Sequence, residues 1–140
     1  MQKWYLLAAV ALGLLPVPCQ ALQEEVPVLP EGEYQTILQP EKEGEVYVLA
    51  FTAKEWCPPC KKFEENILPS LVAEYEGVHF YLVDMTKPTE KDWLFANQFN
   101  IDRYPTTVVL RNGIATSAQV GYDKEKGGSE IEKILAPYKK

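Results

Sequence analysis

The sequence predicts an α/β domain whose central mixed β-sheet is flanked by helices on both faces. Two β-branched and aromatic runs, residues 45–52 and 78–85, have the composition of strands buried on both faces. Apolar residues at helical spacing follow each run, which favours two parallel strands joined by a helix. Asn112-Gly113 is a strong hairpin signal between two further strands, so we expect the later part of the sheet to be antiparallel.

Residues 1–21 have the layout of an export signal. A short basic start precedes the apolar run of residues 4–15, and Ala21 supplies a small residue for cleavage. The run is shorter than the about 20 residues that span a bilayer, so we expect cleavage after Ala21 in preference to an uncleaved anchor. Lipid attachment at Cys19 is a further alternative, which Pro18 disfavours because a small residue is expected at that position.

Three regions follow from this organisation. After the signal, residues 22–33 carry acids and two prolines without periodicity, so we expect a lead-in with little fixed structure. Residues 34–140 form one domain. The net charge of the whole chain is −6, which disfavours nucleic acids and anionic membranes as partners. We therefore expect an exported monomer, periplasmic or otherwise extracytoplasmic, that meets the membrane only through its export signal.

The first part of the domain contains one ambiguous segment and one interrupted helix. Residues 34–38 fit either an edge strand or a helical turn, and the six residues that follow are too few for a crossover helix. Residues 58–75 have apolar side chains at spacings of four, which is typical of a helix. Pro69 has no N–H for the carbonyl of Glu65, so we expect the helix to kink or split there.

The second part begins with a helix and a β-hairpin. Thr89 and Asp92 resemble an N-cap pair that opens a helix extending to about Asn100. Residues 106–110 form the third predicted strand. Residues 114–120 should return antiparallel to it after the Asn-Gly turn.

A last helix is predicted at the C-terminal end. Gly127-Gly128 breaks the chain, and Ser129 with Glu132 forms a capping box. The apolar residues of this helix share one face: Ile131, Ile134, Leu135 and Tyr138. We expect that face to cover the sheet.

The residues that carry chemistry are Trp56, Cys57, Pro58, Pro59, Cys60 and Lys61, which lie between a buried strand and the start of a helix. A helix N-terminus favours a thiolate, the form of cysteine that attacks disulfides. Cys57 is the more exposed position, so we expect it to be the nucleophile. Cys60 lies one helical turn further and can attack the mixed disulfide that Cys57 forms. Pro58 and Pro59 suit the first helical turn, where a missing N–H costs nothing.

Three other interpretations of the two cysteines compete with a redox role. A purely structural disulfide gains little from so short a loop, because closing it removes little entropy from the unfolded chain. A zinc site needs about four ligands. Beyond the two thiols, the mature chain offers one histidine, His79, and no further cysteine, so one chain cannot complete a site made of cysteines and histidines. We interpret His79 as a structural or surface residue. An inert pair fits the strand-to-helix setting least well.

Over residues 45–138 the chain resembles the thioredoxin superfamily. Its W-C-x-x-C-K motif is present from Trp56 to Lys61, and Tyr104-Pro105-Thr106 matches its cis-proline loop. The resemblance implies a thioredoxin-like fold in which Pro105 is cis and packs against the cysteine pair. The backbone of Tyr104 would then pair with an extended substrate. It also implies a redox-active disulfide between Cys57 and Cys60, with no other cofactor and no metal.

Two departures from the family pattern affect the expected chemistry. The buried acid that thioredoxins carry in the central strand is replaced by Ala50 or Phe51, so Glu55 or water would have to handle the proton. An extra residue in the loop of residues 52–56 resembles exported thioredoxin-like proteins and the thiol domains of transmembrane electron carriers.

These features favour a reductase of disulfide-containing proteins. Pro58 and Pro59 offer no N–H to the Cys57 sulfur, so its thiolate is less stabilised than in a strong oxidant. The resemblance suggests a membrane thiol carrier as the electron donor. A disulfide oxidase or isomerase is an alternative, as is a non-catalytic binding or chaperone module that uses the groove around Tyr104 and Trp56.

Overall fold

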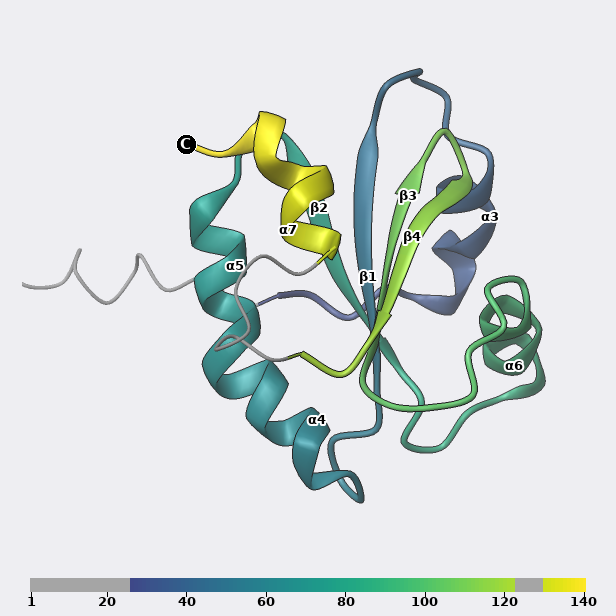
Figure 1. Cartoon of the computed structure of the whole chain (residues 1–140). Coiled ribbons are helices and arrows are strands. Elements are labelled where there is room, and N and C mark those ends of the chain that lie inside the picture. Colours follow the sequence, from purple (N-terminus) through teal and green to yellow (C-terminus); the bar gives the residue numbers. More distant parts are fainter. Residues whose placement is uncertain (1–25, 123–129) are drawn as a thin grey trace, which may run out of the picture.

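The computed structural model describes residues 26–122 and 130–140, and a four-stranded sheet forms its centre (Figure 1). The strands are β1 (Val46–Thr52), β2 (Val78–Asp84), β3 (Thr106–Arg111) and β4 (Ile114–Val120), in the spatial order β2-β1-β3-β4. β1 is parallel to β2 and antiparallel to β3, and β3 is antiparallel to β4. The predicted mixed sheet is therefore confirmed.

Helices cover both faces of this sheet (Figure 1). One face is covered by α4 (Pro58–Lys62), the π-helical turn η2 (Phe63–Ile67), α5 (Leu68–Glu74) and α7 (Glu130–Leu135). The other face is covered by α3 (Tyr34–Leu38) and α6 (Glu90–Asn97). Two short 3₁₀ turns, η1 (Glu31–Glu33) and η4 (Ala136–Tyr138), precede α3 and follow α7.

β1 is buried on both of its faces. Leu49 and Phe51 pack toward α3 and α6, whereas Val48 and Ala50 pack toward η2, α5 and α7. Successive side chains of a strand point to opposite faces, so a strand between two helical layers must be apolar at nearly every position. This central strand ends just before the two cysteines and gives them a rigid base.

The expected interruption of the long helix is confirmed. Pro69 lies in the first turn of α5, and Glu65 lies in the π-helical turn that separates α5 from α4. A proline removes one backbone hydrogen bond, and a wider turn absorbs the mismatch. The two helices still follow one another along the same face of the sheet (Figure 1).

Local signals predicted the start of α6 and the hairpin correctly. Thr89 Oγ1 accepts the N–H of Asp92 at 3.2 Å, and Asp92 Oδ2 accepts the N–H of Thr89 at 2.8 Å, which completes the capping box. The helix ends at Asn97, three residues before the expected Asn100. Both residues of the Asn112-Gly113 turn have positive φ, 53° and 79°.

The expectation of little fixed structure before residue 34 is wrong for residues 26–33. Leu29 is buried in the core, its N–H donates to the carbonyl of Leu82 at 2.7 Å, and the carbonyl of Pro27 accepts the Leu82 N–H at 2.9 Å. These bonds cover part of the edge of β2, whose backbone groups would otherwise lack partners on that side. The ambiguous segment that follows is helix α3.

Some expectations fall on residues that the structure leaves undescribed. The export signal of residues 1–21, Cys19 within it, and the Gly127-Gly128 break with the Ser129 cap all lie outside the described parts of the chain. Within those parts, every helix is too short or too polar to pass through a bilayer.

Candidate active site

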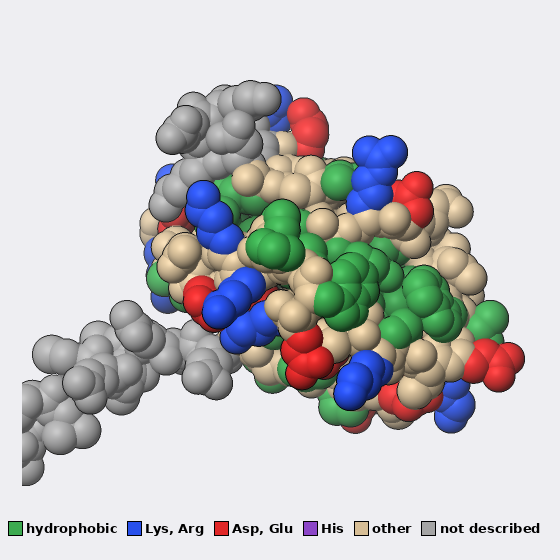
Figure 2. Space-filling model, turned by 90° about the horizontal axis from the view of Figure 1, so that it is seen from below, with side chains coloured by type: hydrophobic (Ala, Val, Ile, Leu, Met, Phe, Trp, Pro, Cys, Tyr) green, Lys and Arg blue, Asp and Glu red, His purple; other side chains and the backbone are tan. Residues whose placement is uncertain are grey.

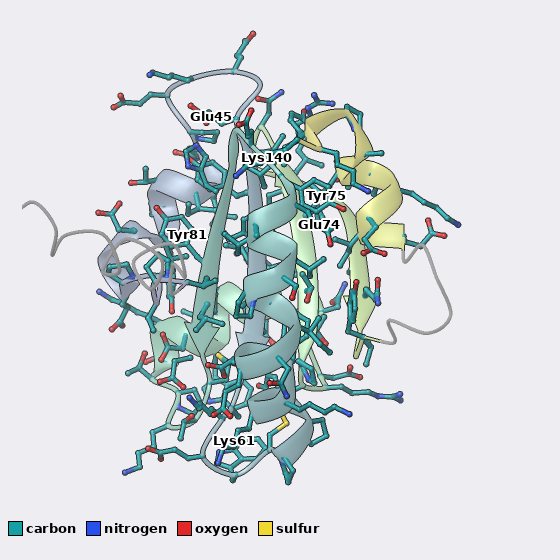
Figure 3. The ribbon with its side chains drawn as sticks, turned by 90° about the vertical axis from the view of Figure 1, so that its left-hand side faces the viewer. Glu45, Lys61, Glu74, Tyr75, Tyr81 and Lys140 are labelled. Atoms are coloured by element: carbon teal, nitrogen blue, oxygen red, sulfur yellow. A yellow bond between two sulfur atoms is a disulfide. The ribbon has the colours of Figure 1, made fainter. Side chains whose placement is uncertain are left out.

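Cys57 and Cys60 form a disulfide at the start of α4. Cys57 is the N-cap residue, Pro58 and Pro59 occupy the first helical turn, and the two cysteine Cα atoms lie 5.2 Å apart. Figure 3 shows the disulfide at the same end of the molecule as Lys61. Cys57 is 8% exposed and Cys60 is 0% exposed. Solvent therefore reaches Cys57 first, as the sequence predicts.

The backbone at the start of α4 directs one N–H at the Cys57 sulfur. The Cys60 N–H donates to Cys57 Sγ at 3.3 Å. Pro58 and Pro59 have no N–H, so Cys60 is the first residue of the helix that can donate to this sulfur. The positive end of the helix dipole adds to this bond and favours a negative charge on Cys57 Sγ when the disulfide is reduced.

The loop before β3 lies against the disulfide. The Tyr104–Pro105 peptide bond is cis, and the carbonyl oxygen of Tyr104 lies 3.7 Å from Cys57 Sγ. Pro105 is buried, and its carbonyl accepts the N–H of Gly121 at 2.7 Å. Thr106 Oγ1 donates to the carbonyl of Arg103 at 2.6 Å, so this hydroxyl fastens the loop itself. The loop that holds the three predicted groove residues thus reaches Cys57 from a distant part of the chain, through the carbonyl of Tyr104.

Two aromatic side chains border the disulfide. Tyr104 packs against Ala53, Cys57 and Cys60, and burial raises the pKa of its phenol. Trp56 is 58% exposed and meets the Tyr104 ring edge to face at 5.8 Å between centroids. The indole N–H of Trp56 donates to the carbonyl of Thr86 at 3.0 Å, which fixes the exposed ring. Thr86 was not predicted, because a backbone acceptor has no signature in the sequence.

The two charged residues that the sequence places around the cysteine pair, Glu55 and Lys61, are both exposed. Ala50 is buried in the apolar cluster beneath η2, α5 and α7, so of the two candidates it faces the helical layer that begins with α4. Glu55 is exposed and lines an outer cavity of about 370 Å³ together with Asp84 and Lys87. Lys61 is exposed at the edge of α4.

His79 lies at the other end of the sheet. Its Nε2 is 2.6 Å from a carboxylate oxygen of Glu45, and its ring stacks on Tyr47. Figure 3 shows Glu45 at the end of the molecule opposite Lys61. Across residues 26–122 and 130–140, no group of three or more histidine, cysteine and acidic residues is arranged to hold a metal ion.

Comparison with known protein families gives one clear match. The Thioredoxin family model matches residues 25–135. Putative thioredoxin H10 of Arabidopsis thaliana is 31% identical over 102 residues, which cover 73% of this chain and 60% of that protein. The chain therefore spans less than two thirds of the length of that relative. Disulfide bond reductase DsbH of Chlamydia pneumoniae is 24% identical over 98% of both proteins.

Solved structures agree with this match. Thioredoxin NaTrxh of Nicotiana alata superposes with a TM-score of 0.65 at 24% identity, covering 84% of this chain and 95% of that one. A reduced thioredoxin pre-protein of Schistosoma mansoni gives a TM-score of 0.61 at 26% identity, covering 82% and 99%. The mixed sheet and its helical layers are those of these structures.

Proposed function

This chain belongs to the thioredoxin family, and we propose that it is a thiol–disulfide oxidoreductase that reduces protein disulfides outside the cytoplasm. Cys57 attacks the substrate disulfide, and Cys60 then resolves the mixed disulfide that forms. The observation that carries the proposal is the N-cap position of Cys57, with one N–H on its sulfur, beside a fully buried Cys60. Trp56 and Lys61 flank the pair, and Tyr104, Pro105 and Thr106 supply the groove beside it.

The reaction is two thiol–disulfide exchanges. The Cys57 thiolate attacks one sulfur of the substrate disulfide, forms a mixed disulfide and releases the other substrate sulfur as a thiolate, which takes up a proton. Cys60, after losing its proton, attacks Cys57 Sγ and releases the second substrate thiolate. Two electrons pass to the substrate, and the protein is left with the Cys57–Cys60 disulfide. A dithiol donor must then reduce that disulfide before the next turnover.

The first turn of α4 supports one direction of electron flow. A strong oxidant stabilises its reduced thiolate, and prolines at both positions between the cysteines leave the Cys60 N–H as the local donor. We therefore propose a potential nearer the roughly −270 mV of thioredoxin than the roughly −120 mV of DsbA. The name of the Chlamydia pneumoniae relative, a disulfide bond reductase, supports this direction.

Location and partners are part of the proposal. Residues 1–21 carry the pattern of a cleaved export signal, which supports a periplasmic or other extracytoplasmic site for a monomer. Thioredoxin-like proteins act on disulfide-containing proteins, and an extended substrate segment would pair with the backbone of Tyr104. A membrane thiol carrier would supply electrons in such a compartment. We also assign residues 26–33 to the folded domain, because Pro27 and Leu29 are hydrogen-bonded to Leu82 of β2.

An insulin-reduction assay tests the activity. The wild type should reduce insulin with a dithiol donor, and Cys57→Ser should lose this activity. If the variant and the wild type behave alike, the protein is a binding or chaperone module and the enzymatic proposal fails. A glutathione-redox titration tests the direction, because a potential above roughly −180 mV, the value of protein disulfide isomerase, would indicate an oxidase or isomerase. Cys60→Ser should trap the mixed disulfide and so identify the substrate.

A further inference from the structure

We propose that Asp84 is a positioning residue for the reaction, because its carboxylate fixes the backbone carbonyl that holds Trp56 beside the reactive disulfide. Asp84 acts through Thr86 and Trp56, and it acts as a hydrogen-bond acceptor, so a neutral acceptor at this position should serve as well. This inference rests on the proposed function and adds a residue to the machinery of the same site.

Packing alone leaves the indole ring of Trp56 loosely held. The side chain is 58% exposed, at the end of the molecule that carries the start of α4, where Figure 2 shows hydrophobic side chains gathered between charged ones. The indole N–H donates to the carbonyl of Thr86 at 3.0 Å. An exposed side chain changes rotamer within nanoseconds unless a directional contact fixes it. The hydrogen bond to Thr86 therefore decides where the ring lies.

The segment that supplies this carbonyl is itself fastened at the end of β2. Asp84 is the last residue of the strand, and its Oδ1 accepts the N–H of Thr86 at 2.9 Å, which closes an Asx turn. Met85, between them, is fully buried, and its N–H donates to the carbonyl of Thr52 at 2.7 Å. With Met85 anchored in the core, the Asx turn restricts the remaining backbone rotation at Thr86 and so directs its carbonyl toward the indole.

Trp56 passes this order on to the disulfide. Its ring meets the Tyr104 ring edge to face at 5.8 Å between centroids. The Tyr104 side chain packs in turn on Cys57 and Cys60. A side chain that is already fixed loses little entropy when a substrate binds beside it. Asp84 therefore prepares the surroundings of the sulfur from one strand away.

The hydrogen bond, and not the charge, is what distinguishes Asp84 from the acids near it. Three further carboxylates line the same cavity of about 370 Å³: Glu31, Glu55 and Asp92. Glu31, for example, accepts a hydrogen bond from the hydroxyl of Thr89. Asp84 is the acid whose oxygen closes the turn at Thr86. Its negative charge is one of four in the cavity, whereas this bond is its own.

Exchange of the Trp56 indole N–H with solvent measures the positioning directly. In the ¹⁵N-labelled full chain, Asp84→Ala should speed this exchange about fivefold, the factor that a typical net hydrogen bond contributes. Asp84→Asn keeps a side-chain oxygen that can accept the Thr86 N–H, so it should restore the wild-type rate. The indole N–H of Trp93 is the internal reference and should not change.

The kcat/KM for insulin connects this contact to the reaction. Asp84→Ala should lower it about fivefold, and Asp84→Asn should restore it. In a Trp56→Phe background the indole N–H is missing. Asp84→Ala should then have no further effect, because two residues that act through one contact are not additive.

Glu31→Gln is the matched control. It removes a negative charge from the same cavity, but Glu31 bonds to Thr89 and not to Thr86, so both measurements should stay unchanged. The inference is overturned if Asp84→Ala leaves the indole exchange unchanged or if Asp84→Asn fails to restore it. An equal loss of kcat/KM in the wild-type and Trp56→Phe backgrounds would overturn it too. A wild type that does not reduce insulin would contradict the proposed function, and the exchange rates would still decide whether Asp84 positions Trp56.

Discussion

The carbonyl oxygen of Tyr104 lies 3.7 Å from Cys57 Sγ, although 47 positions separate the two residues in the chain. The N-cap of α4 and the cis-proline loop before β3 meet at this contact. The ring of Tyr104 also packs on the disulfide, so every substrate that reaches Cys57 must fit beside a bulky aromatic side chain.

Tyr104→Thr is therefore expected to widen the range of disulfides that the protein reduces. The smaller side chain removes the bulk that borders the sulfur and leaves the backbone carbonyl in place. The measurement is kcat/KM for a panel of protein disulfides of different size around the cysteine. Tyr104→Phe keeps the ring and should keep the wild-type profile, whereas an unchanged profile for Tyr104→Thr would count against this role.

The hairpin turn between β3 and β4 is expected to tolerate no side chain at Gly113. Its φ is +79°, and a Cβ there would collide with the backbone of Leu38. Gly113→Ala should therefore lower the free energy of unfolding by about 2–5 kcal/mol, through the left-handed backbone and the overlap together.

Gly77→Ala is the control for that change. Gly77 has a φ of +74° but open space around its Cβ position, so only the backbone term of about 1–2 kcal/mol applies. Urea unfolding of the oxidised protein measures both variants. If both variants lose the same free energy of unfolding, the close approach of Gly113 to Leu38 contributes nothing to the loss.

The Tyr34–Asp92 hydrogen bond predicts a loss of stability at alkaline pH. Burial, followed by the hydrogen bond to Asp92, raises the pKa of Tyr34 above its usual value of 10.0. Below about pH 10 the phenol is neutral in both states and its contribution is complete. Above that pH the unfolded state ionises more readily than the folded state, so stability falls as the pH rises toward the folded pKa.

Tyr34→Phe should therefore cost about 1–2 kcal/mol at pH 7 and flatten the decline between pH 9 and pH 11. Urea unfolding at several pH values measures both effects. Tyr138→Phe serves as the control, because the Tyr138 hydroxyl accepts a hydrogen bond from the cation Arg111 at 2.7 Å, whereas the Tyr34 hydroxyl donates to a carboxylate. A decline that is equally steep in wild type and Tyr34→Phe would contradict the assignment.

Features decided by the chemistry of one or two neighbouring residues were predictable from the sequence. Pro69 cannot donate a backbone hydrogen bond. It therefore interrupts the helix whatever the helix packs against. Asn112 and Gly113 accept positive φ, and the hairpin follows. The cysteine pair was recognised in the same way, because a strand followed by prolines and a helical pattern places Cys57 at a helix start.

Features that depend on distant backbone groups were not predictable. Two prolines and several acids suggested an unstructured lead-in, yet Leu29 and Pro27 need only one N–H and one carbonyl to pair with Leu82. The same is true of the carbonyl of Thr86 that fixes Trp56. Asp92 was predicted as part of a cap, but its second partner, Tyr34, depends on how α3 packs against α6.

Alkylation of the reduced protein tests most directly whether Cys57 is held ready as an anion. The protein is treated with iodoacetamide at pH 7, and the modified cysteine is located by mass spectrometry. We predict that Cys57 reacts about tenfold faster than a cysteine in an unstructured peptide, because the helix start favours the thiolate. Cys60, which is fully buried, should stay unmodified. A Cys57 that reacts no faster than the peptide thiol, or equal labelling of both cysteines, would contradict the account.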